Sequence, residues 1–374
     1  MGTLAEGDGA AAEKAGSGFQ PPQSGDRPRI VIVGAGFGGL ACAQALGGSD
    51  VQVTLVDRRN YHLFAPLLYQ VATAALSPTD IASPIRSLLR RHANVAVVMG
   101  TVSGVDWRGR QVLLEGGESL PYDRLVLSTG AVYSYFGHDD WEAVAPGLKT
   151  LDDARTLRAR LLGGFEAAEL LDDPERQRAL TTSVVVGGGP TGVEMAGAIA
   201  ELRRDALRHE FRRIDPALAR VILVEAGPRI LSGFPEHLGA FARERLEDLG
   251  VEVLTGTAVE EVREDGVAVG GGFIPAGTLV WAAGTRASPV ARWLDLEGDR
   301  AGRVAVEPDF SVPGRPGVHV IGDAAACRDE AGALLPGLAQ VAKQQGHHLG
   351  RELARSRGDG PLAPSASTTA ATPR

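Results

Sequence analysis

The sequence is poor in cysteine, in long apolar runs and in surplus positive charge. Its 374 residues include only Cys42 and Cys327, which argues against a disulfide framework and indicates a reducing compartment. These two cysteines are too far apart to form the CxxC or Cx4C pair of a dithiol enzyme. No apolar run reaches 18 residues, so no membrane-spanning helix is predicted. The net charge of −8 argues against nucleic acid as a partner.

The rest of the composition is that of an ordinary globular protein, with 44% hydrophobic and 22% charged residues. The length suggests two domains. Residues 1–28 are rich in Gly, Ala, Ser and Pro and lack the apolar core of a signal peptide, so we expect a disordered leader there. Residues 356–374 are predicted to be a disordered tail for the same compositional reason.

A strand, a glycine-rich turn and a helix open the folded part of the chain. Ile30–Val33 is a short β-branched run typical of a buried parallel strand. Gly34, Gly36 and Gly39 follow it as a GxGxxG motif, ahead of a helix-forming stretch. In such a motif the glycines allow a tight turn, a close approach to a pyrophosphate and the packing of helix on strand. Phosphate oxygens would bind the free N–H groups at the start of the helix.

The next strand strengthens this interpretation, because it ends in an acid. Val51–Asp57 reads as a second buried strand, and Asp57 follows the motif at close to the expected spacing of about 20 residues. An acid at this position binds a ribose hydroxyl in dinucleotide-binding folds. The first stretch therefore predicts a dinucleotide site.

The same pattern then occurs a second time. Ser183–Val186 is again a strand, and GGGPTG supplies Gly187, Gly189 and Gly192 as a second GxGxxG motif. A helix is expected from Val193 to about residue 208. Two complete fingerprints in one chain predict two dinucleotide-binding domains.

The acid of the second fingerprint also indicates which nucleotide is preferred. The strand Val221–Val224 ends in Glu225, which can accept hydrogen bonds from both ribose hydroxyls and would repel a 2′-phosphate. Ala226 and Gly227 come next, so no arginine follows directly. The sequence favours NADH over NADPH.

Three further apolar strands end in small or acidic residues, which is where open parallel sheets bind ligands. Asp323 follows the last of them and either holds a polyol hydroxyl or caps the next helix, and the sequence leaves both interpretations open. The strands are Leu125–Leu127 before Thr129 and Gly130, Thr278–Ala282 before Ala283 and Gly284, and Gly317–Ile321 before Gly322 and Asp323.

Two other segments have an ordinary and a functional interpretation. Arg58–Ile81 is rich in aromatics and prolines, and forms either a loop packed on the core or the wall of a cofactor ring pocket. Pro336–Arg355 is predicted to be a helix with Gln340, Gln344 and Gln345 on or near one face. From the residues alone, these glutamines belong to a solvated helix face.

These stretches together resemble the type II NADH dehydrogenases, single-subunit NADH:quinone oxidoreductases that pump no protons. The resemblance runs from about Arg29 to Gly350 and includes IVIVGAGFGGL, NYHLFAPLLYQVA, VVVGGGPTGVEMAGAIAEL and AQVAKQQG. It implies an α/β fold of the pyridine nucleotide-disulfide oxidoreductase type with two Rossmann-like domains. An NADH-binding domain, residues 151–284, would be inserted into an FAD-binding domain, residues 29–150 and 285–355.

The resemblance also implies roles for individual residues. Glu194 would relay a proton near the flavin and nicotinamide, although its residue-level interpretation as a first-turn glutamate stabilised by the helix dipole stays open. Gln340 and Gln344 would lie on the quinone side, and no metal is expected. The FAD set would be Gly34, Gly36, Phe37, Gly38, Gly39, Asp57, Arg58, Thr129, Gly130, Gly322 and Asp323. The NADH set would be Gly187, Gly189, Pro190, Thr191, Gly192, Glu225, Ala283 and Gly284.

The implied reaction has two halves, in which NADH reduces the flavin and the flavin then reduces a quinone. The family works in the cytoplasm, peripheral to the inner face of the cell membrane, and a homodimer is an expected state. Membrane-binding elements of the family are not recognised after about Arg355, so we expect contact with the membrane surface only where such a region is supplied. A soluble NADH diaphorase and a non-catalytic FAD- and NAD-binding remnant are the alternatives. A third alternative is an enzyme whose electron acceptor is a protein of the ferredoxin or rubredoxin type. A dithiol-dependent flavoenzyme is disfavoured because neither cysteine has a partner at the required spacing.

Overall fold

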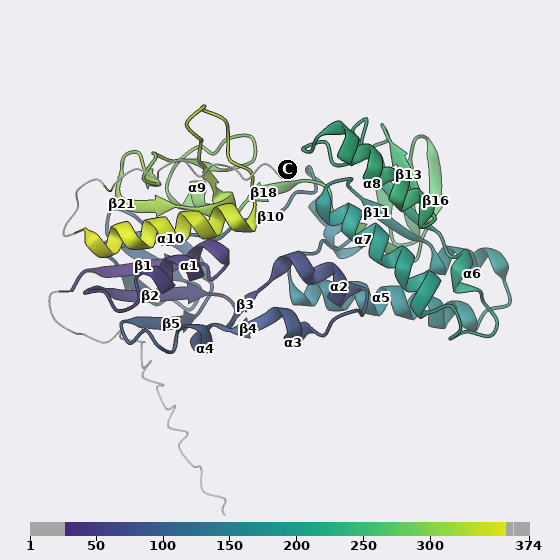
Figure 1. Ribbon diagram of the computed structural model, residues 1–374, viewed down its shortest axis with the longest axis horizontal. Helices are drawn as coiled ribbons and strands as arrows, with labels where there is room; N and C mark the ends of the chain where they lie inside the picture. Colours follow the sequence, from purple (N-terminus) through teal and green to yellow (C-terminus); the bar gives the residue numbers. More distant parts are fainter. Residues whose placement is uncertain (1–26, 357–361, 363–374) are drawn as a thin grey trace, which may run out of the picture.

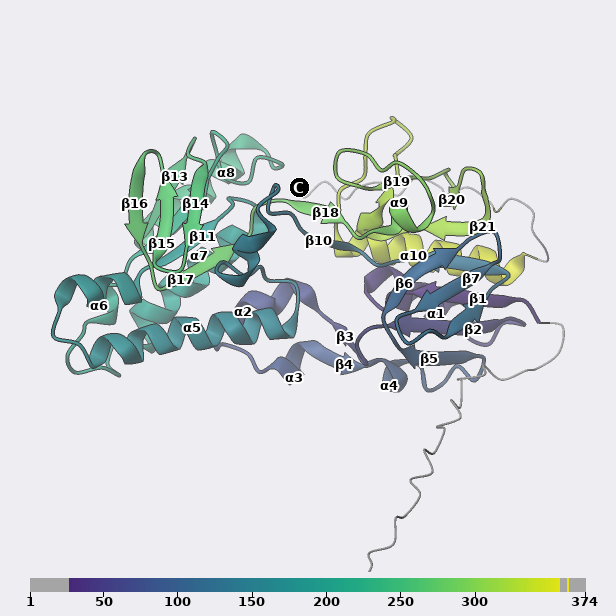
Figure 2. The same ribbon diagram turned by 180° about the vertical axis from the view of Figure 1, so that it is seen from behind.

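The computed structural model describes residues 27–356 and Leu362, so the predicted leader and tail lie almost entirely outside the described residues. Two lobes lie side by side (Figure 1), and the strands β10 (Ala131–Tyr133) and β18 (Thr285–Ala287) run between them (Figure 2). Within the described ranges, no helix is both long enough and apolar enough to cross a membrane.

The first lobe is built on a six-stranded sheet in the order β20-β21-β9-β1-β2-β5. All neighbours are parallel except β20 and β21, and the aliphatic side chains of β1 and β9 are almost fully buried, as expected for a sheet covered on both faces. Helices α1 and α10 cover one face (Figure 1), and the antiparallel sheet β6-β7-β8 covers the other (Figure 2). The bounds are β1 Arg29–Val33, β2 Gln52–Asp57, β5 Val95–Met99, β9 Arg124–Leu127, β20 Ser311–Val312, β21 Arg315–Val320, β6 Val102–Asp106, β7 Gln111–Leu114, β8 Ser119–Pro121, α1 Phe37–Ala45 and α10 Ala339–Arg355.

Glycines bring the backbones of α1 and α10 unusually close together. A Cβ on Gly346 would overlap the carbonyl oxygen of Gly38, and a Cβ on Gly350 would lie 2.7 Å from that of Cys42. Gly38 in turn has room for no side chain, because its Cβ would lie 2.8 Å from the Ser128 hydroxyl oxygen. The middle of α10 is thereby held against α1, the helix that follows the first glycine turn.

The second lobe contains a fully parallel sheet in the order β13-β12-β11-β17. Helices α5 and α7 pack on it through apolar side chains (Figure 1), and the antiparallel sheet β14-β15-β16 lies on its other side (Figure 2). The bounds are β11 Ser183–Val186, β12 Val221–Glu225, β13 Val251–Thr255, β17 Thr278–Trp281, β14 Val259–Arg263, β15 Gly266–Val269, β16 Gly272–Pro275, α5 Leu151–Glu169, α6 Pro174–Thr181, α7 Pro190–Glu201 and α8 Glu236–Asp248.

A segment of the first lobe crosses over and packs on the second. Leu68, Val71 and Ala72 of α2 are buried in the same hydrophobic cluster as Leu157 of α5 and Ala196 of α7. This segment belongs to the stretch 29–150 that the sequence assigns to FAD binding, so its core contacts are shared between the lobes. Its elements are β3 Tyr61–Leu63, α2 Leu68–Ala72, α3 Pro78–Ile81, β4 Ala82–Pro84 and α4 Ile85–Leu89.

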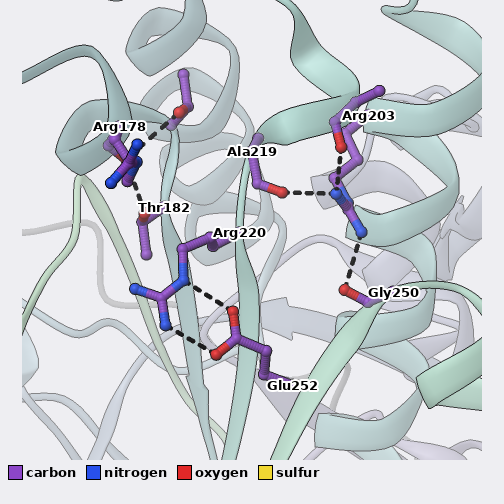
Figure 3. A network of polar contacts seen from close by, with 9 residues as sticks. Arg178, Thr182, Arg203, Ala219, Arg220, Gly250 and Glu252 are labelled. Carbon is purple, nitrogen blue, oxygen red and sulfur yellow. Dashed lines mark hydrogen bonds and ion pairs between the residues drawn. The ribbon is translucent and has the colours of Figure 1, made fainter. Parts of the chain in front are cut away.

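The helix expected over residues 193–208 begins earlier and ends earlier than predicted. It starts at Pro190, because Gly189 is its N-cap and proline suits the first helical position. After Glu201 the chain forms a π-helical turn, Leu202–Ala206, in which the buried Arg203 guanidinium donates to the carbonyls of Ala219 and Gly250 (Figure 3). This polar cluster, with the Arg220–Glu252 ion pair beside it (Figure 3), closes the amino-terminal edge of the second sheet.

Candidate functional site

The first glycine turn has a backbone that only glycine satisfies. Gly34 has a φ of +98°, and a Cβ on Gly39 would overlap the Gly34 carbonyl oxygen. By contrast, the space beside Gly36 is open, because a Cβ there would meet no atom within 4 Å. Gly36 is also the N-cap of α1 and no side chain of the described residues caps that helix. The turn therefore presents backbone N–H groups to a cradle that fits a phosphate.

The second glycine turn repeats this geometry in the other sheet. Gly187 has a φ of +111°, and a Cβ on Gly192 would overlap the Gly187 carbonyl oxygen. Gly189 is again open and again the N-cap of a helix without a side-chain cap among the described residues. Pro190 and Thr191 form the first positions of that helix, α7. Two anion cradles of the same design therefore lie on two different sheets.

Each strand-end acid binds its own glycine turn directly. Asp57 accepts hydrogen bonds from the backbone N–H of Ala35 at 2.7 Å and of Arg59 at 2.8 Å. Glu225 accepts from Gly188 and from Gly227, both at 2.6 Å. Each carboxylate oxygen has a second acceptor position, so both acids can brace the turn and still accept from a ribose. Arg58, the residue after the first acid, is exposed.

The carboxyl ends of β9 and β17 lead to the same junction between the lobes. After Thr129 and Gly130 the chain enters β10, which pairs antiparallel with β18, the strand that follows Ala283 and Gly284. The Thr129 hydroxyl lies 2.5 Å from that of Ser288, which closes the junction. Both parallel sheets therefore end at one place, where ligands of the two glycine turns can meet.

The turn after β21 is held by a buried glutamine. The Gln345 amide oxygen accepts from the N–H of Gly322 at 2.8 Å, and Gln345 is 1% exposed. Asp323 follows in a short 3-10 turn, and its side chain caps no helix among the described residues. The structure therefore argues against the interpretation of Asp323 as a helix cap. Its carboxylate is half-buried beside α10.

The three glutamines of α10 separate into two kinds. Gln340 and Gln344 are four residues apart on the exposed face of the helix, whereas Gln345 points into the core. The helix begins at Ala339 rather than at Pro336, because Leu338 is still extended and acts as its N-cap. Gln340 is therefore in its first turn.

Glu194 does not lie in the first turn of its helix. It is the fifth residue of α7, and that helix has no acidic residue in its first turn. Although the residue is exposed, nearby protein desolvates its carboxyl and raises its pKa. A helix dipole would lower the pKa instead, so the dipole interpretation does not describe this glutamate. A carboxyl with a raised pKa is suited to carrying a proton.

The aromatic segment after Asp57 begins against the first glycine turn. His62 Nδ1 lies 2.9 Å from the Ala35 carbonyl oxygen. The ring of Phe37, the first residue of α1, makes edge contacts with the rings of His62 and Phe64. The first part of the segment therefore borders the cradle, and the part from Leu68 packs on the other lobe as described above.

Three residues at these sites carried no signal that we read from the sequence. Ser288 and the core-facing position of Gln345 depend on contacts between distant segments. Lys149 is half-buried beside the ring of Tyr133. The one feature of the sequence that draws attention to it is that lysine is rare in this arginine-rich chain.

The two cysteines do not form a redox centre. Both are buried and free, and desolvation raises the pKa of Cys42 to about 12. Their thiols are unreactive at neutral pH, which agrees with the sequence argument against dithiol chemistry.

Comparison with known proteins identifies the family. The family described as pyridine nucleotide-disulphide oxidoreductase matches residues 28–346. Two type II NADH:quinone oxidoreductases of Mycobacterium tuberculosis are each 47% identical to this chain; the matches cover 87% and 82% of it, and 71% and 68% of the relatives. An external alternative NADH-ubiquinone oxidoreductase of Yarrowia lipolytica is 32% identical, with 88% of this chain and 60% of the relative covered.

Solved structures show the same fold at lower identity. NDH2 of Plasmodium falciparum in complex with NADH matches with a TM-score of 0.79 and 20% identity, covering 87% of this chain and 83% of that one. The sulfide:quinone oxidoreductase of Aquifex aeolicus matches with a TM-score of 0.71 and 19% identity, covering 88% and 76%. The predicted fold class is thereby confirmed. The chain belongs to the pyridine nucleotide-disulphide oxidoreductase family and, within it, to the type II NADH:quinone oxidoreductases.

Proposed function

We propose that this chain binds FAD and NADH and transfers two electrons from NADH to a quinone without pumping protons. The observation that carries this proposal is the pair of matched glycine turns, one on each sheet, whose strand ends meet at the β10–β18 junction. Two dinucleotides bound in this way would bring their reactive ends together. When bound, the flavin accepts a hydride from NADH and passes two electrons to the quinone.

We assign FAD to the first turn and NADH to the second. The FAD part comprises residues 29–150 and 285–355, and the NADH part comprises residues 151–284. Gly34, Gly36 and Gly39 with Phe37 and Gly38 would hold the FAD pyrophosphate at the start of α1. Asp57 and Arg58 would hold its adenosine end, and Thr129, Gly130, Gly322 and Asp323 would line its ribityl side.

The second turn is built for NADH rather than NADPH. Glu225 is fixed by two backbone N–H groups and cannot move away from a 2′-phosphate. Arg229, four residues later, donates to the carbonyls of Leu231, Ser232 and Phe234, so its guanidinium is engaged within its own loop. We therefore propose that neither residue offers a phosphate site. The remaining NADH contacts would come from Gly187, Gly189, Pro190, Thr191, Gly192, Ala283 and Gly284.

Glu194, Gln340 and Gln344 are assigned to the quinone half of the reaction. Reduction of a quinone consumes two protons, and the raised pKa of the Glu194 carboxyl favours its protonated form, which can deliver one of them. Gln340 and Gln344 would bind or orient the quinone with their exposed amides. These residues bind, orient and transfer protons, while the flavin supplies the electron chemistry.

The location and assembly of the protein are further parts of this proposal. Respiratory quinones are lipid-soluble, so we propose that the protein works in the cytoplasm and contacts the inner face of the cell membrane only where a membrane-binding region is supplied. We also propose that it forms a homodimer. Flotation with lipid vesicles tests the first statement and sedimentation equilibrium tests the second.

An anaerobic spectroscopic titration tests the proposed function. The flavin absorbance of the purified protein is recorded, NADH is added, and a soluble quinone analogue follows. We expect NADH to bleach the flavin and the quinone to restore its absorbance. Bleaching without restoration by quinone, but with restoration by dyes or oxygen, would instead make the chain a diaphorase. Absence of bleaching, or of flavin, would contradict the enzyme assignment and leave a binding remnant.

A further inference from the structure

Lysine is rare in this chain, and one of its few lysines lies where the two lobes meet. Of 38 basic residues, only Lys14, Lys149 and Lys343 are lysines. Lys149 precedes α5 and is half-buried, whereas Lys343 is exposed on α10. The lysine side chain differs from that of arginine because its charge is concentrated on one compact ammonium group with three N–H donors. A protein that uses arginine almost everywhere has a compact ammonium at this position.

The backbone of Lys149 is fixed by a helix cap. The Asp153 carboxylate accepts from the N–H of Lys149 at 2.9 Å and of Thr150 at 2.8 Å, and the Thr150 hydroxyl accepts from the N–H of Asp153. This reciprocal arrangement is a capping box with one extra bond. The side chain of Lys149 therefore leaves from a rigid point.

The ammonium of Lys149 lies in a site that protein surrounds but does not neutralise. Its Nζ is 5.2 Å from the centre of the Tyr133 ring, and Tyr133 is held against this segment because Gly147 has no side chain. Asp323 attracts the ammonium electrostatically, yet no ion pair of Lys149 with a carboxylate is found among the described residues. Desolvation outweighs the attraction of Asp323 and lowers the pKa of the ammonium.

Buried charges in proteins are normally paired or bind a ligand. The groups around this ammonium are Asp323, assigned above to the ribityl chain of FAD, and Tyr133 of β10, which follows Thr129 and Gly130. The ribityl chain connects the FAD phosphates to the flavin ring, so the next group beyond Asp323 is the ring itself. Its pyrimidine edge has carbonyl acceptors, and it becomes negatively charged on reduction.

We propose that Lys149 is a flavin-contacting residue whose ammonium stabilises the reduced, anionic flavin. This inference rests on the proposed function, because it requires FAD in the first site. In the step concerned, a hydride leaves NADH, which becomes NAD⁺, and the flavin gains two electrons and one proton, with one net negative charge. Lys149 keeps its proton throughout and balances that charge, so it raises the midpoint potential of the flavin.

The test compares the flavin midpoint potential in the wild type, Lys149→Met, Lys149→Arg and the control Lys343→Met. Loss of the ammonium should weaken binding of reduced FAD relative to oxidised FAD by about tenfold, which makes the two-electron potential about 30 mV more negative. Lys149→Arg keeps the charge and should shift the potential by less than half of that. Lys343→Met removes an exposed charge and should leave the potential unchanged.

Two results would overturn the proposal. One is an unchanged potential in a Lys149→Met protein that retains FAD, which would make Lys149 a structural residue. The other is an unchanged potential with a raised NADH dissociation constant, which would place the ammonium on the substrate. If Lys149→Met does not fold, Lys149→Gln gives the same comparison with a polar side chain. A wild type without flavin would instead refute the proposed function itself.

Discussion

Replacing Glu225 with glutamine exchanges one hydrogen-bond acceptor for a donor at the centre of the second turn. In the structure both carboxylate oxygens accept backbone N–H groups, from Gly188 and Gly227, at 2.6 Å. A glutamine can satisfy one of them, and its NH₂ group then faces the other N–H as a second donor. An unsatisfied polar group costs about 1–3 kcal/mol when fully buried. Because Glu225 is half-buried, the lower part of that range applies.

We therefore expect Glu225→Gln to weaken NADH binding about 5- to 30-fold, since 1.4 kcal/mol corresponds to a factor of ten. NADPH binding should not improve to the level of NADH, because Arg229 stays engaged with its own loop. The limiting rate of flavin reduction should change little, since Glu225 binds the substrate equally before and during the reaction.

The assay is anaerobic stopped-flow reduction of the flavin at several NADH and NADPH concentrations, which separates the dissociation constant from the limiting rate. Glu247→Gln, an exposed helix residue paired with Arg243, is the matched control and should behave as the wild type. An unchanged dissociation constant, or a lower limiting rate with unchanged binding, would refute this account of Glu225.

Three further predictions concern other sites. Asp57→Ala removes the acceptor of two backbone N–H groups in the first turn and should weaken FAD retention about tenfold or more. Retention is measured as the amount of flavin per protein after gel filtration. Full retention would contradict the assignment of FAD to the first turn. Glu194→Gln should slow the reoxidation of the flavin by quinone more than its reduction by NADH. In the wild type the rate of reoxidation should decline at high pH, and this decline should be absent from the variant. Equal slowing of both steps would instead indicate that Glu194 positions NADH. Burial lowers the pKa of His319 to about 4 from 6.5, so the fold favours its neutral form and loses stability as pH falls from about 6.5 to 4. The full loss is about 3 kcal/mol, and denaturant unfolding of His319→Gln should show that much less pH dependence than the wild type.

The glycine turns and their acids could be predicted because they depend on local chemistry. Gly34 and Gly187 require a backbone that few other residues adopt, and in both fingerprints an acid stands at the end of the following strand. The position of the buried strands was likewise predictable from short β-branched runs. Each set of these features is encoded within one continuous strand–turn–helix–strand segment of the sequence.

The remaining features depend on contacts between distant segments. Gln345 and Gln344 are adjacent and chemically identical, and only the packing of α10 on α1 determines which of them supports the turn at Gly322. The burial of Leu68 in the second lobe, and the approach of Lys149 to Tyr133, are also invisible in a linear pattern. The sequence could identify the two nucleotide modules but not the residues that join them.

The most direct test of the central claim is a crystal structure of the FAD-containing protein with NADH introduced anaerobically. We expect the FAD pyrophosphate at the turn of Gly34 to Gly39 and the NADH pyrophosphate at the turn of Gly187 to Gly192. We also expect the flavin and nicotinamide rings to meet at the β10–β18 junction. Exchanged positions, or a second turn that binds no nucleotide, would contradict this claim.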